Sequence, residues 1–131
     1  MSALTDVIEA LRAAGLTVYD SEVGGTAPVS YAVVSDRDAG QSRPHRADPG
    51  TNHWTLITID VRCVDRTRNG QRELARRVRA ALTGKRLAPG EGVFQEFEAS
   101  PDMPSTSPDD RRHELVIGYR AHYQTEGAIR P

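Results

Sequence analysis

The chain contains a single cysteine, Cys63, which excludes an internal disulfide and a structural zinc site built from several cysteines. No apolar run approaches the ~20 residues of a membrane-spanning helix. The first residues lack the basic and apolar regions of a secretory signal. The net charge is −1, so a general attraction to nucleic acid or to anionic membranes is not expected. These absences predict a soluble protein with no membrane partner and no export through a signal peptide.

Motifs for catalysis are also lacking. The sequence has no G-x-S-x-G nucleophile elbow, no phosphate-binding loop and no dinucleotide fingerprint. Its four histidines do not follow the H-x-H or H-x-x-x-H spacing that places two ligands on one metal. Cys63 falls on the apolar side of a strand pattern, where a thiol is usually a small core residue. We therefore predict no catalytic, cofactor-binding or metal-binding residues, no cofactor and no enzymatic activity.

The sequence does contain periodic segments typical of helices and strands. Two segments place apolar residues at i, i+3, i+4 and i+7 and predict amphipathic helices over 3–14 and 67–82. Strand patterns cover 16–19, 29–35, 53–65, 92–99 and 112–124. The longest strand patterns alternate between apolar and polar residues, as expected for a sheet with one buried face.

This order predicts one α+β domain over 1–131. Two helices with one apolar stripe each can cover only one face of a sheet. We therefore predict a two-layer sandwich in which a mostly antiparallel sheet of four to five strands carries both helices on one face.

Two features of the predicted strands and loops are unusual. The pattern over 53–65 exceeds the usual strand length of about 5–6 residues, and we expect it to project past the sheet as one arm of a hairpin. Trp54 and Leu56 lie on the opposite side of this strand from its other apolar residues, which predicts a bulge or burial of that end on both faces. The loops over 36–52 and 100–111 are long for simple connectors, which indicates loops that are functional, disordered or ordered by a partner.

Charge is distributed unevenly along the chain. Residues 62–86 carry nine basic residues against two acids, a net charge of +7, whereas residues 91–114 carry seven acids against two arginines, a net charge of −5. The two segments can neutralise each other within one chain, the basic helix can face nucleic acid, or it can meet the acidic segment of the next copy. A head-to-tail contact of the last kind closes into a ring when its rotation allows. The candidate residues for a subunit contact or a central channel are Arg68, Arg72, Arg76, Arg79, Glu96, Glu98, Asp109 and Asp110.

Five stretches in this order carry a family resemblance: A-A-G at 13–15, L-T-V-Y-D at 16–20, P-V-S-Y-A-V-V at 28–34, W-T-L-I-T-I-D-V-R-C at 54–63 and N-G-Q-R-E-L-A-R-R-V-R-A-A-L at 69–82. The pattern resembles the small tail terminator (tail completion) proteins of long-tailed bacteriophages. It covers most of the chain. Head-closure and neck proteins of the same virions are similar in size and style, and they are kept as the alternative.

The resemblance implies a structural virion protein that is assembled in the host cytoplasm and located at the head–tail junction. It implies a homo-oligomeric ring, usually a hexamer, that caps the tail tube and stops its polymerisation. The ring would contact the tail tube protein and the head–tail connector or neck protein. Genomic DNA would pass non-specifically through its lumen. The family offers no active-site residues, and the loops over 36–52 and 100–111 would be candidates for contacts with tube or connector.

Two further hypotheses come from other classes of protein. A small α+β ligand-binding domain or enzyme would hold a pocket between helices and sheet, with His113 or His122 and Tyr119 or Tyr123 as its polar groups. A nucleic-acid-binding module would use the arginines of the 67–82 helix, and its affinity for DNA would fall steeply with salt.

Overall fold

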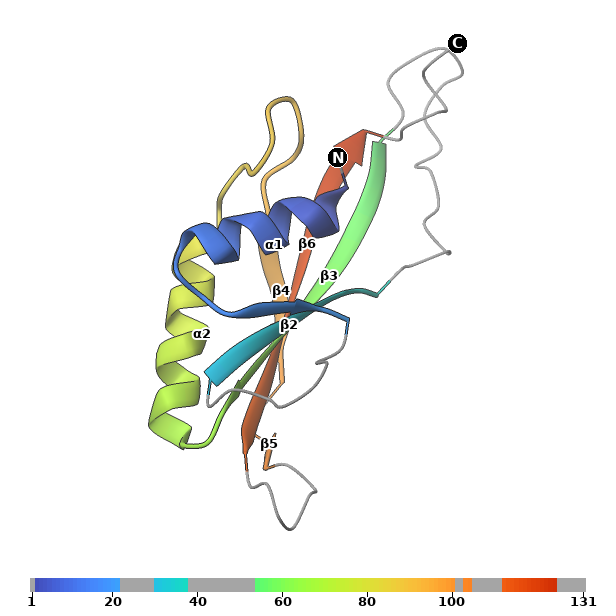
Figure 1. Cartoon of the computed structure of the whole chain (residues 1–131). Helices are drawn as coiled ribbons and strands as arrows, with labels where there is room; N and C mark the ends of the chain where they lie inside the picture. Colours follow the sequence, from blue (N-terminus) through green and yellow to red (C-terminus); the bar gives the residue numbers. More distant parts are fainter. Residues whose placement is uncertain (1, 22–29, 38–53, 101–102, 105–111, 125–131) are drawn as a thin grey trace.

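The computed structural model describes residues 2–21, 30–37, 54–100, 103–104 and 112–124. Its elements are α1 (Ala3–Ala13), β1 (Val18–Asp20), β2 (Ser30–Asp36), β3 (Trp54–Asp65), α2 (Arg68–Leu82), β4 (Gln95–Ala99), β5 (Met103–Pro104) and β6 (His113–Gln124) (Figure 1). Both predicted helices and all five predicted strands are present, with the short β5 in addition, so the α+β class is confirmed. Most of the predicted loops at 36–52 and 100–111 lies outside the described residues.

The strands form one open sheet in the order β1-β2-β3-β6-β4, and β5 also pairs with β6. β1 runs parallel to β2, and all other pairs are antiparallel, as predicted for a mostly antiparallel sheet. The centre of the sheet is the pair β3–β6, in which Trp54 to Asp65 align with Gln124 to His113 without a register shift. These two strands are far apart in the sequence and carry the rest of the sheet on either side.

The first half of β3 has neither the bulge nor the burial on both faces that the sequence predicted. β2 pairs with β3 only from Ile59 to Asp65, so within the described sheet residues 54–58 of β3 form a ladder with β6 alone. The predicted bulge in β3 is wrong because the register with β6 is continuous. Burial of that end on both faces is wrong as well, because Leu56 is 38% exposed. Leu56 is therefore an apolar side chain on the side of the strand that faces away from the core.

Both helices pack on one face of the sheet and enclose the main core (Figure 1). α1 contributes Val7 and Leu11, and α2 contributes Val78 and Leu82, all of them fully buried against the strands. Burial of each such side chain stabilises the fold by about 1.5–3 kcal/mol. The helices begin at capping residues: the Ser2 hydroxyl accepts a hydrogen bond from the backbone N–H of Thr5, and the Thr67 hydroxyl accepts one from Gly70. None of the described helices is long and apolar enough to cross a bilayer.

A buried polar contact ties α1 to the far end of β6. The Tyr123 hydroxyl donates a hydrogen bond of 2.7 Å to Oδ2 of Asp6. Asp6 is only 4% exposed, although it lies in the first turn of the helix. Its carboxylate therefore depends on Tyr123 in place of water.

The outer face of the sheet, which faces away from the helices, is not uniformly polar. Tyr31, Val33 and Val64 form a second small buried cluster, and Tyr19 packs against it with its ring 5.8 Å from that of Tyr31. The guanidinium of Arg112 lies 5.5 Å from the Tyr31 ring centroid and covers the cluster. The remainder of the outer face carries charged side chains, which are the first candidates for an interaction surface.

Candidate functional site

The exposed side of α2 carries a row of arginines. The helix buries Gln71, Leu74, Ala75, Val78 and Leu82 toward the sheet, which directs the positions between them to the surface. Arg68, Arg72 and Arg76 follow one another at i, i+4 spacing and are all exposed. We call these three residues the α2 ridge. The structure thus brings together three of the candidate residues that were predicted for a subunit contact or a channel.

Two arginines of the α2 ridge, Arg72 and Arg76, differ in their ion pairs. Glu73 forms a two-point contact with Arg76, with Oε1 2.5 Å from Nη2 and Oε2 3.0 Å from Nε. This hydrogen-bonded pair lowers the pKa of Glu73 and raises that of Arg76. The Arg76 side chain is nevertheless 68% exposed, so the pair adds little stability in water. Arg72 forms no ion pair with any residue that the structure describes.

Arg79 and Glu96, also predicted as contact residues, pair with each other inside one chain. Nε of Arg79 lies 2.9 Å from Oε1 of Glu96, and its Nη2 lies 3.1 Å from Oε2, which is the bidentate arrangement that arginine favours. This hydrogen bonding raises the pKa of Arg79. Neutralisation within the chain, one of the three interpretations of the charge pattern, therefore applies to this pair.

A bulge in β4 explains why its two glutamates serve different surfaces. Glu96 aligns with Tyr119 of β6, but Glu98 aligns with Gly118, so that Phe97 is the extra residue. The bulge reverses the alternation of side chains. Glu96 consequently points to the helix side and meets Arg79, whereas Glu98 points to the outer face. The same bulge interrupts the alternation of apolar and polar residues over 92–99.

On the outer face, Arg37 bridges two strands over a glycine. Its Nε and Nη2 lie 3.1 and 2.6 Å from the carboxylate oxygens of Asp60, and Nη2 also donates to Glu98. These hydrogen bonds, with Asp60 first, raise the pKa of Arg37. A Cβ on Gly118 would lie 3.2 Å from Nη2 of Arg37, 3.0 Å from Glu98 and 3.1 Å from Phe97. An alanine at position 118 would therefore require these three side chains to shift by a few tenths of an ångström.

Aromatic contacts continue the same network. The guanidinium of Arg37 lies 5.2 Å from the centroid of the Phe97 ring, and that of Arg120 lies 5.4 Å from it. Nearby, Nε of Arg62 pairs with Glu114 at 3.4 Å. Sequence reasoning missed Arg37, which fell in a predicted loop, and it missed the role of Phe97. The only signal available was the alternation that places Asp60 and Arg62 on the polar side of β3.

Glu98 is therefore a residue of the outer-face network, and Asp109 and Asp110 lie outside the described residues. Of the eight candidate residues, the structure gathers three on the α2 ridge and two in the Arg79–Glu96 pair. It separates Glu98 from both groups.

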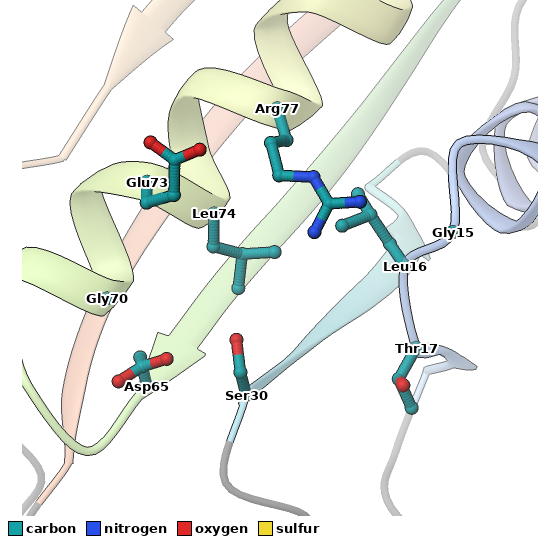
Figure 2. Close-up of a pocket in the computed structure, with 9 residues that line it drawn as sticks. All are labelled: Gly15, Leu16, Thr17, Ser30, Asp65, Gly70, Glu73, Leu74 and Arg77. Carbon is teal, nitrogen blue, oxygen red and sulfur yellow. The ribbon is translucent and has the colours of Figure 1, made fainter.

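A hollow of about 330 Å³ lies where the start of α2 meets the ends of β2 and β3 and the turn after α1 (Figure 2). Leu74 points into it, and the Arg77 guanidinium extends toward Leu16 (Figure 2). Arg77 is held there by a hydrogen bond of 2.8 Å to the carbonyl of Ala14. At the other side, the buried Asp65 accepts hydrogen bonds from the backbone N–H and the hydroxyl of Thr67. Arg77 and Asp65, two of the polar residues that line the hollow, thus connect α2 to the end of α1 and to the end of β3.

The tyrosines proposed for a ligand pocket are engaged in structural contacts. Tyr119 shares a hydrogen bond of 2.9 Å with the hydroxyl of Thr83, and burial raises its pKa to about 12. Burial is the main cause that raises the pKa of Tyr123, and the hydrogen bond to Asp6 raises it further. Burial also raises the pKa of the Cys63 thiol to about 12, as expected for a core residue. Across the described ranges, no three His, Cys, Asp or Glu side chains are grouped to hold a metal ion.

Comparison of the sequence with protein-family models and with curated proteins gives no match. The fold, however, is similar to that of a chain in a solved structure described as "Virion of native gene transfer agent (GTA) particle". The TM-score is 0.63 at 16% sequence identity, and the alignment covers 95% of this chain and 96% of that chain. The two chains thus share a fold over nearly their whole lengths.

Proposed function

We propose that this chain is a structural protein of a phage-like virion and performs no reaction. The observation that carries the proposal is the similarity of fold, over nearly the full length of both chains, to a chain of a gene transfer agent virion.

Within such a virion, we propose the role of a tail terminator. A ring of copies, with six as the expected number, caps the tail tube, ends its polymerisation and contacts the head–tail connector. One observation supports a repeated side-by-side contact. The outer sheet face carries an ordered network of charged groups around Arg37. A head-to-tail contact made through such a surface generates a ring when its rotation closes.

A head-closure or neck protein of the same virion is the second candidate, because the fold similarity extends to a virion without specifying a position in it. Both roles predict self-association and contact with other virion proteins. They differ in whether the chain binds the tail tube.

The test is native mass spectrometry and negative-stain electron microscopy of the purified chain, alone and mixed with tubes of the tail tube protein from the same genome. We expect closed rings, alone or at tube ends, and tubes that stop growing after they are capped. Binding to purified connector particles, without binding to tubes, would assign the neck role. A protein that stays monomeric and ignores both tubes and connectors would refute the virion proposal.

A further inference from the structure

We infer that the α2 ridge is a binding surface for the phosphate backbone of nucleic acid. This inference deepens the proposed function and rests on it for the source of the polyanion, which is the DNA of the particle. The ridge consists of Arg68, Arg72 and Arg76. Exposed cations flank it in the sequence, with Arg66 before the helix and Lys85 and Arg86 after it.

The first argument comes from the acids. The competing interpretation is that the ridge meets the acidic segment of a neighbouring copy. In the described part of that segment, each acidic side chain already has a partner within its own chain. Glu96 pairs with Arg79, Glu98 with Arg37 and Glu114 with Arg62, and Glu91 accepts a hydrogen bond from the backbone of Gln124. Each of these four described acids would therefore have to share or exchange its present partner before it could neutralise the ridge of a neighbouring copy.

The second argument comes from the helix itself. The first turn of α2 contains no acidic residue of its own, and Arg68 is its first residue; the carboxylate at this end of the helix belongs to Asp65, which accepts a hydrogen bond from the backbone N–H of Thr67. Like charges at i, i+4 spacing also repel each other along the ridge. Glu73 offsets the charge of Arg76, whereas Arg72 forms no ion pair with a described residue. Such unfavourable charge placement within a helix is found mainly at functional sites. A bound external anion would relieve the repulsion between the arginines of the ridge.

The third argument is geometric. Residues four apart on a helix are separated by about 6 Å along its axis. Adjacent phosphates on one strand of DNA are separated through space by roughly 7 Å, because the strand winds around the axis in addition to its rise of about 3.4 Å per nucleotide. The ridge can therefore follow one strand with one arginine for each successive phosphate. Arginine, with its planar fork of donors, is suited to phosphate. Contacts of this kind carry no sequence specificity.

The experiment measures binding of the full-length chain to a fluorescein-labelled linear DNA duplex by fluorescence anisotropy between 50 and 200 mM NaCl. With three to four phosphates neutralised, we expect affinity to fall roughly 10²-fold over this range. In the double variant Arg72→Gln/Arg76→Gln, the slope of log K against log salt should decrease by about two, and affinity at 100 mM salt should fall about tenfold or more.

The matched control is Arg62→Gln/Arg120→Gln, which removes the same charge from the outer sheet face and should leave the salt slope unchanged. Equal losses in the two double variants would overturn the inference, because they would indicate an effect of net charge alone. Unchanged DNA binding in the ridge variant, with loss of self-association in native mass spectrometry, would also overturn it in favour of the contact between copies. Rings that form normally but bind no DNA would refute this inference and leave the proposed function intact, whereas a wild-type chain that never assembles would refute the proposed function itself.

Discussion

The hydrogen bond between Tyr123 and Asp6 allows a quantitative test of how α1 is held on the sheet. The Tyr123→Phe substitution keeps the ring in the core and removes only the hydroxyl. The Asp6 carboxylate is then left without its buried donor. A hydrogen bond to a charged group contributes about 1.5–3 kcal/mol, so we expect a loss of about 2 kcal/mol in the free energy of unfolding. For a chain of this size, that corresponds to a decrease of roughly 6–8 °C in Tm.

The matched control is Tyr119→Phe, which removes the same atom from the same strand. The partner of Tyr119 is the hydroxyl of Thr83, which belongs to an exposed residue that water can reach. We expect this substitution to cost only about 0.5–1 kcal/mol. Urea unfolding followed by circular dichroism would measure both losses. If the two variants lost the same stability, the Asp6 carboxylate would have to be solvated in the native state, and the reasoning would be wrong.

The same residue predicts the effect of alkaline pH. The pKa of Tyr123 is raised in the folded state, so the native protein holds this proton more tightly than the unfolded chain does. Its contribution to stability is therefore complete below the ordinary tyrosine pKa of about 10 and decreases as the pH rises above that value. The difference in stability between the wild type and Tyr123→Phe should narrow above pH 10. A constant difference through pH 11 would contradict the assignment.

Three other predictions concern the core and the charged surfaces. Gly92→Ala should destabilise the protein more than Gly118→Ala in the same urea assay, because a Cβ at 92 meets the backbone oxygen of His122 at 2.5 Å, whereas at 118 it meets side chains at 3.0 Å or more. The thiol of Cys63, fully buried with a pKa of about 12, should react with a thiol reagent only on unfolding, and rapid modification of the native protein would show that the core is open there. A double-mutant cycle of Arg79→Gln and Glu96→Gln should give a coupling energy below about 1 kcal/mol, because both side chains are partly exposed, and a larger value would mean that water is excluded from the pair.

The spacing of apolar residues was sufficient to predict the helices and the long strands, because this spacing shows within each segment which face is buried. The predicted helix over 67–82 corresponds to α2, with Thr67 as the capping residue. The order of the strands was not accessible in the same way. The pairing of β3 with β6 joins segments about sixty residues apart, and no local pattern encodes such a partner.

The candidate site was predicted less completely for the same reason. The arginines of the α2 ridge share one helix, so their spacing alone places them together. The partners of Glu96 and Glu98 depend on the extra residue Phe97, which sends the two carboxylates to opposite faces of the sheet. Charge counting treated these acids as a single patch. A single residue inserted in a strand was enough to divide it.

The two outermost strands of the described sheet limit how it can pair with a strand of another copy. β1 offers only three residues, and β4 is interrupted by its bulge, so neither presents the long flat row of free amide and carbonyl groups on which another strand can be laid. Two copies of this chain are therefore less able to join through these two edges into a continuous cross-β sheet. A contact made at either edge would have to depend on side chains.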